Sequence, residues 1–175
     1  MFDLTGGVDV EIELARAEEF ERVGQLTADA YVADGLASGA YVDELRDASA
    51  RAEAGFLLVA RDRSSGDLLG TASLFTWRAA ARWSQGAQTG DAVLRMLAVA
   101  PAARRRGVGR LLVRESLRRS ADLGCRRLVL VSSTAMTAAH LLYEQLGFVR
   151  DPARDRSPQA GVDLLAYQRA VPRRP

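Results

Sequence analysis

One run of residues constrains the fold of this chain more than any other: AVLRMLAV at residues 92–99, followed by APAARRRGVG and then RLLVRESL. Only Arg95 is charged in the first run, and such a run is typical of a strand that is buried on both faces. Pro101 ends this strand, and apolar residues then recur at helical spacing from Val108 to Leu117, with Gly124 beyond them. The sequence therefore predicts a buried strand, a Gly-x-Gly turn and a helix in succession.

The turn in this unit is suited to a phosphate ligand. Gly107 and Gly109 permit positive φ and a close approach of backbone or ligand. The first amides of a helix have no acceptor within the helix, and their partial positive charge lies at the turn. The N–H groups from Arg105 to Arg110 would therefore form a row that fits a pyrophosphate.

The arginines of the same stretch support a different interpretation, a nucleic-acid surface. Arg110, Arg114 and Arg118 recur every four residues on the predicted helix, and the chain carries a net charge of +2. Glu115 and Asp122 interrupt this basic stripe, however, and no helix-turn-helix or RNA-binding aromatic pattern accompanies it. Nucleic-acid binding is therefore the third hypothesis, and nucleic acid is not the partner we expect.

Strand and helix patterns alternate along the rest of the chain. Two strand-like runs joined by RSSGD predict a β-hairpin, whereas residues 78–90 have no clear period and are expected to form a loop. This order indicates a mixed sheet with helices, of class α/β or α+β, in a single domain over residues 1–175. The predicted strands are 8–14, 56–62, 68–77, 92–99, 126–133, 148–150 and 161–171, and the predicted helices are 17–34, 40–54, 108–123 and 139–146.

Composition excludes several kinds of site. All 24 side chains counted as Lys or Arg are arginine, so a Walker-type phosphate loop and a pyridoxal phosphate Schiff base both lack their lysine. His140 and Cys125 are the only residues of their types, which leaves a Cys/His zinc site without enough ligands, and no metal is expected. No apolar run approaches the roughly 20 residues of a membrane helix, and the start of the sequence has no signal-peptide pattern. A cytoplasmic protein is expected.

The glycine turn and a second segment, SSTAMTAAHLLYEQLGF, together resemble motifs A and B of the GNAT superfamily of N-acetyltransferases. The signature Q/R-x-x-G-x-G/A is matched by Arg104, Gly107 and Gly109. The resemblance is specific from about Leu94 to Phe148 and is greatest to bacterial members without an assigned substrate. It implies a central mixed, mostly antiparallel sheet flanked by helices, with splayed fourth and fifth strands, and acetyl-CoA as co-substrate.

The resemblance also implies a role for individual residues. Tyr143 matches the tyrosine near the thioester sulfur, and Ala139 matches the small residue one turn earlier. Met136 stands where many relatives have an asparagine, so this chain departs from the family pattern at that position. The implied cofactor-binding residues are Leu97, Ala98 and Val99 along the pantetheine arm, and Arg104, Arg105, Arg106, Gly107, Val108, Gly109 and Arg110 around the pyrophosphate.

Transfer of an acetyl group to an amine requires a stabilised leaving thiolate and a neutral amine. Tyr143 is the candidate general acid. Because a phenol has a pKa of about 10 and a thiol about 8.5, full proton transfer is uphill by about 2 kcal/mol, and we expect mainly a hydrogen bond to the sulfur. Asp91, next to the fourth strand, is the candidate base. Glu44, Asp34, His140 or a water chain are the alternatives.

The acceptor site is the least constrained by the sequence. Tyr31 and Trp77 are the candidate substrate-binding residues, and Arg78 and Arg82 favour an acceptor with an acidic group. Cys125 is interpreted as a small buried residue rather than an acyl-enzyme nucleophile.

The expected function is acetyl-CoA-dependent transfer to a primary amine of an unidentified small molecule or peptide. The alternative is a non-catalytic acyl-CoA-binding sensor or interaction module. Relatives of this kind are often dimers, so a homodimer is one expectation.

Overall fold

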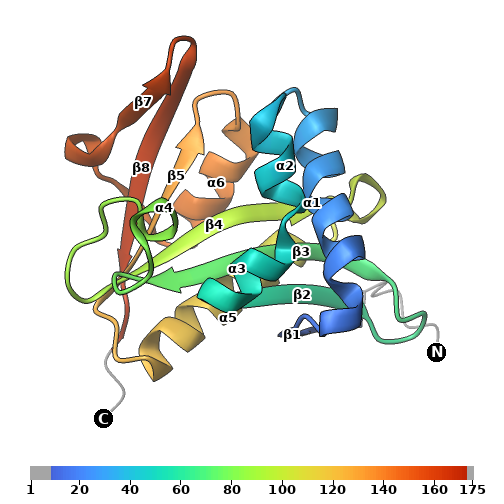
Figure 1. The fold of residues 1–175 in the computed structure, drawn as a ribbon. Coiled ribbons are helices and arrows are strands. Elements are labelled where there is room, and N and C mark those ends of the chain that lie inside the picture. Colours follow the sequence, from blue (N-terminus) through green and yellow to red (C-terminus); the bar gives the residue numbers. More distant parts are fainter. Residues whose placement is uncertain (1–8, 173–175) are drawn as a thin grey trace.

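In the computed structural model, which describes residues 9–172, eight strands form one sheet (Figure 1). The order is β1-β2-β3-β4-β5-β8-β6, and β7 pairs with β8 outside this path. Neighbouring strands are antiparallel except for β4 and β5, which are parallel. The sheet is therefore mixed and mostly antiparallel, as predicted. The strands are β1 Val10–Leu14, β2 Phe56–Asp62, β3 Leu68–Thr76, β4 Asp91–Val99, β5 Arg127–Ser133, β6 Val149–Arg150, β7 Arg156–Gln159 and β8 Val162–Ala170.

Helices cover both faces of this sheet (Figure 1). Three N-terminal helices lie over one face, and the two longer C-terminal ones pack on the other. Among residues 9–172, no helix is both long and apolar enough to span a bilayer. The helices are α1 Phe20–Ala33, α2 Ala40–Arg46, α3 Ala48–Ala54, α4 Ala81–Ser84, α5 Val108–Asp122 and α6 Thr137–Gln145, with 3₁₀ turns η1 Ala17–Glu19, η2 Pro101–Ala103 and η3 Pro152–Arg154.

Burial on both faces explains the continuous apolar run of β4. Val93 packs into the core beneath α1–α3, whereas Ala92 and Leu94 pack into the core beneath α5 and α6. Gly70 of β3 allows this second core to close, because a Cβ there would lie 2.8 Å from the carbonyl oxygen of Ala98 and 3.1 Å from a methyl group of Val108. Helix α5 therefore packs directly against the backbone of the sheet.

The strands β4 and β5 pair only at their beginnings. Asp91, Ala92 and Val93 are matched with Arg127, Leu128 and Val129, and no later residue of either strand pairs across this junction. On its other side, β4 has a bulge opposite β3, where Met96 has a φ of +52° and the register shifts. The two parallel strands thus diverge toward their carboxyl ends. This is the splay implied by the family resemblance.

The structure differs from the predicted local structure at four places. Residues 40–54 form two helices, because the Asp47 carboxylate accepts a hydrogen bond from the amide of Ala50 (3.0 Å) and starts α3 there. The expected loop 78–90 contains α4, whose Trp83 is buried and stacks on Phe75 with ring centroids 5.0 Å apart. The first strand begins at Val10 rather than Val8, which lies outside the described residues, and β7 was not predicted.

Candidate active site

A cavity of about 840 Å³ opens where β4 and β5 diverge. The end of β4 forms one side, the turn before α5 the floor, and the ends of α1 and α6 the remaining walls. We call it the large cavity. Most of the predicted site residues meet in its wall, namely Tyr31, Leu97, Ala98, Val99, Arg104, Arg105, Gly107, Val108, Gly109, Arg110 and Tyr143, together with Met136 and Ala139.

The turn before α5 presents unpaired amides. Within the described chain, the first backbone hydrogen bond of this helix runs from the amide of Leu111 to the carbonyl of Gly107 (3.1 Å), and the amides of Arg105–Arg110 have no backbone acceptor. Left-handed φ values at Arg105 (+60°) and Gly107 (+79°) curve the chain here. Successive N–H groups in such a curved segment form a concave site for an anion.

Two arginines of the turn are held by carboxylates. Arg104 donates two hydrogen bonds of 2.9 Å to Asp34 at the end of α1, and so connects α1 to the turn. Arg106 is not part of the cavity wall, because its guanidinium lies 3.7 Å from the carboxylate of Asp62. Of the four arginines in and after this turn, Arg104, Arg105 and Arg110 therefore line the cavity together with the backbone, and Arg106 does not.

Tyr143 and Tyr31 reach the large cavity from opposite sides of the sheet. Burial raises the pKa of Tyr143, and the nearby Tyr167 adds to this effect. Burial likewise raises the pKa of Tyr31, with smaller contributions from Tyr41 and then Tyr143. Both phenols therefore stay protonated at neutral pH. The Tyr143 ring is fixed by Phe148 and Tyr167, with ring centroids 5.7 and 5.8 Å away.

Asp91 lies away from this cavity, at the paired beginning of β4. It is almost completely buried and accepts hydrogen bonds from Arg127 (2.9 Å), Arg154 (3.0 Å) and the amide of Gln88 (2.9 Å). Both carboxylate oxygens of Asp91 therefore already accept hydrogen bonds, and Asp91 is not part of the wall of the large cavity. Its position gives no support to the expected role of base.

The other candidates for proton transfer are also engaged. Glu44 lies 3.5 Å from the guanidinium of Arg95, and Asp34 is bonded to Arg104. His140 is half-buried with Nε2 3.0 Å from the carbonyl oxygen of Ser133, rather than facing solvent. Cys125 is buried, and burial raises the pKa of its thiol, which agrees with a packing role.

Trp77 and the two arginines proposed for the acceptor lie outside the large cavity. Trp77 packs against the core beneath α5 and α6, and Arg78 lies over its ring at 4.9 Å. Arg82 lies over the ring of Trp83 at 4.6 Å.

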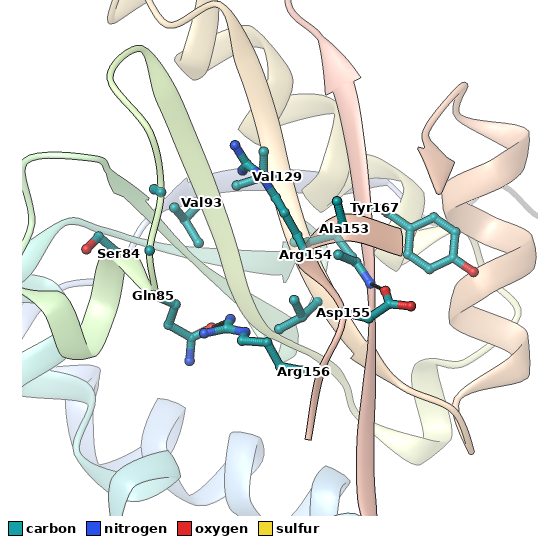
Figure 2. Close-up of a pocket in the computed structure, with 14 residues that line it drawn as sticks. Ser84, Gln85, Val93, Val129, Ala153, Arg154, Asp155, Arg156 and Tyr167 are labelled. Atoms are coloured by element: carbon teal, nitrogen blue, oxygen red, sulfur yellow. Dashed lines mark hydrogen bonds between the residues drawn. The ribbon is translucent and has the colours of Figure 1, made fainter. Parts of the chain in front are cut away.

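A second cavity, of about 280 Å³, lies beside β4 and β5 near the residues where the two strands are still paired. Its wall includes Val93 and Val129, the last matched pair of β4 and β5. Figure 2 shows it lined on one side by residues around Ser84 and Gln85, and on the other by Ala153 to Arg156. We call it the small cavity. Sequence reasoning missed Ser84 and Arg156 because they lie in α4 and β7, neither of which was predicted.

The basic stripe of α5 is neutralised at one of its three arginines, Arg118, and a second, Arg110, is hydrogen-bonded to a neutral side chain. Arg118 donates to both oxygens of Glu115 (2.6 and 2.7 Å) and to Asp122 (2.6 Å), and Arg110 donates to Gln145 (2.5 Å). Two of the three stripe arginines are thus engaged within the protein, which weakens the support for a nucleic-acid surface.

Comparison with known proteins decides the family. The sequence profile of the Acetyltransferase (GNAT) family matches residues 13–148, which is most of the chain. The chain belongs to this family. The glycine turn, the divergent strands and Tyr143 thus lie in a GNAT acetyltransferase, and the expectation from the resemblance is confirmed at this level.

Solved structures share the fold of this GNAT protein. A GNAT acetyltransferase from Staphylococcus aureus Mu50 superposes with a TM-score of 0.73 at 13% identity, covering 93% of this chain and 99% of the other. A GCN5-related N-acetyltransferase from Kribbella flavida gives 0.68 at 26% identity, covering 92% and 97%. The protein yncA from Salmonella typhimurium, solved with its cofactor acetyl-CoA, gives 0.69 at 18% identity, covering 93% and 94%.

A curated relative is similar over a shorter region. N-alpha-acetyltransferase 30 from Xenopus laevis is 40% identical over 70 residues, which are 40% of this chain and 26% of that protein. The match thus spans about a quarter of that relative.

Proposed function

We propose that this GNAT protein transfers an acetyl group from acetyl-CoA directly to a primary amine of a small acceptor. The observation that carries the proposal is the row of unpaired amides at Arg105–Arg110 in the same cavity wall as Tyr143. Membership of the family does not by itself locate a site. These two features place an anion-binding turn and a proton donor in the wall of the same cavity.

The residues present fit acetyl-CoA. The amides of Arg105–Arg110 and the left-handed turn suit its pyrophosphate, and Leu97, Ala98 and Val99 lie along the cavity where β4 has no partner from β5. The volume of about 840 Å³ lies within the roughly 300–1,000 Å³ typical of small-molecule sites. A relative of the same fold, yncA, contains acetyl-CoA.

Acetyl-CoA would supply an activated thioester with a thiolate leaving group. Within the large cavity, Tyr143 holds a proton at Oη, and its raised pKa keeps that proton in place at neutral pH. The phenol therefore acts mainly as a hydrogen-bond donor to the departing sulfur. Since the carboxylates nearest the site are engaged by arginines, the acceptor amine enters in its neutral form by losing its proton to water.

Binding of acetyl-CoA is the first test. Thermal unfolding with acetyl-CoA, with CoA and with ATP should show higher Tm values with the first two ligands only, because ligand at 100 times Kd adds about 2.7 kcal/mol to stability. CoA release during incubation with a panel of amines then measures transfer. A higher Tm with acetyl-CoA but no release of CoA with any amine would support the non-catalytic sensor. An unchanged Tm at millimolar acetyl-CoA would contradict the proposed phosphate-binding role of the turn.

Two matched glycines control for backbone strain. Gly107 at the turn and Gly66 in the β2–β3 hairpin both have left-handed φ values (+79° and +77°), and an added Cβ meets no atom within 4 Å at either site. Substitution by alanine should therefore lower the free energy of unfolding by a similar amount at both sites, about 1 kcal/mol. Only Gly107→Ala should also weaken acetyl-CoA binding, by about tenfold, because only this turn presents the amides.

A further inference from the structure

An ion pair joins two walls of the large cavity. Asp34 lies at the end of α1 and Arg104 at the start of the turn before α5, and both line the cavity. The guanidinium of Arg104 donates one hydrogen bond of 2.9 Å to each carboxylate oxygen of Asp34. The two side chains are 39% and 41% exposed, and ion pairs at such sites add little to stability. A competing anion can therefore replace one partner. We call this pair the clasp.

The clasp attaches the loop between α1 and α2, residues 34–39, to the rest of the protein. Within residues 9–172, Arg104 is the only residue outside α1 and α2 that forms a hydrogen bond with this loop. Leu36 of the loop lines the large cavity, and its amide donates to the carbonyl of Tyr31 (2.9 Å). A movement of the loop would therefore reach Tyr31, the residue expected to contact the acceptor.

Arg104 also lies on the edge of β4 that faces the gap. The amide of Ala100 donates to the carbonyl of Leu69 in β3 (2.9 Å). In a trans peptide the carbonyl points away from the N–H of the same unit, so the carbonyl of Val99 points away from β3. The Nε of Arg104 lies 3.5 Å from this oxygen. The side chain thus occupies part of the unpaired edge that we assign to acetyl-CoA.

We propose that the clasp couples the two substrates: an anion bound at the turn takes Arg104 from Asp34, releases the loop and so changes the acceptor wall around Tyr31. Phosphate oxygens match the parallel N–H groups of a guanidinium as well as carboxylate oxygens do. Arg104 directly precedes the amides of 105–110, so the phosphate and Asp34 compete for one side chain. Such coupling is reciprocal, and loss of the clasp should strengthen anion binding. This inference rests on the acetyl-CoA binding proposed above.

Hydrogen–deuterium exchange read by mass spectrometry tests the release of the loop. In the wild type, CoA should slow exchange in residues 105–111 and speed it in residues 34–39 by about threefold or more, because a segment without its attachment opens more often. In Asp34→Ala, residues 34–39 should exchange fast without CoA, and CoA should cause no further increase. Arg118→Met breaks an exposed ion pair with Glu115 instead and should behave like the wild type.

Isothermal titration with CoA tests the competition for Arg104. Asp34→Ala should lower the Kd by about two- to fivefold, the range expected for an exposed ion pair. Loss of a carboxylate near a polyanion would also lower the Kd without any clasp. The double variant separates the two effects: in the Arg104→Met background, Asp34→Ala should change the Kd by less than about 1.5-fold, because the pair is already broken.

The two measurements also separate failure of the clasp from failure of the acetyl-CoA site. Slower exchange in residues 105–111 with unchanged or slower exchange in residues 34–39 would overturn the clasp and leave the acetyl-CoA site intact. An equal effect of Asp34→Ala with and without Arg104 would assign that effect to long-range charge, and would also overturn the clasp. Unchanged exchange in residues 105–111 at millimolar CoA would reject both.

Discussion

At the scale of single residues, the raised pKa of Tyr143 leads to a prediction. Tyr143→Phe removes the only proton that this side chain can donate while preserving the ring contacts with Phe148 and Tyr167. The value of kcat should fall by roughly 10²-fold, which is typical of a lost general acid or charge-stabilising donor. The Tm shift with acetyl-CoA should be unchanged, and it also shows that the variant is folded. An unchanged kcat would exclude the proposed role.

The pH profile of the wild type is a second readout of the same residue. Burial raises the pKa of Tyr143 above the ordinary value of about 10, and the protonated form is the active one. Activity should therefore not decline up to pH 10, whereas kcat/KM should rise with pH as the acceptor ammonium loses its proton. A declining limb between pH 8 and 9.5 in the wild type would contradict this assignment.

Single residues also show which contacts can be predicted from the sequence and which cannot. The turn residues could be placed from sequence because Gly107 and its neighbours are contiguous and their backbone geometry is local. Asp91 could not be assigned in this way, since its partners Arg127 and Arg154 lie 36 and 63 residues further along the chain. Their contact depends on the pairing of β4 with β5 and on the return of the chain through η3.

At the scale of elements, hydrophobic patterns identified β1 to β5, β8 and the helices α1, α5 and α6, because each of these elements buries apolar side chains in a core. They missed α4, whose four residues are too few for a period and whose helical turn is stabilised by the burial of Trp83 against Phe75. They also joined α2 to α3, since the apolar pattern continues through Asp47. A helix boundary that is set by one capping carboxylate does not change the hydrophobic periodicity, so periodicity cannot detect it.

The capping role of Asp47 can be measured. Asp47→Ala removes the acceptor for the amide of Ala50 and should lower the free energy of unfolding by about 1 kcal/mol, the usual cost of a lost N-cap. Urea denaturation would show this as a lower midpoint at unchanged slope. Ser49→Ala in the same turn, where the hydroxyl bonds only to the exposed Glu53, should cause no such loss. Equal effects of the two substitutions would mean that the cap does not stabilise α3.

At the scale of the whole molecule, the positions of the two cavities and of the cysteine bear on the kinetic mechanism. The cavities share no lining residue and border the β4–β5 gap from its open and closed ends. A ligand in one cavity therefore does not have to displace a ligand from the other. The one cysteine, Cys125, is buried with a raised thiol pKa, so it is a poor site for an acyl-enzyme.

This arrangement predicts a sequential mechanism. Initial rates measured at several fixed concentrations of amine, with acetyl-CoA varied, should give intersecting lines in double-reciprocal plots, because both substrates must be bound before the acetyl group moves. Cys125→Ala should retain activity, since the thiol only fills space beside the sheet, although the smaller side chain will cost some stability. Parallel lines, or release of one equivalent of CoA before any amine is added, would instead indicate a covalent intermediate. Such a result would place the acetyl group on a side chain before the amine binds.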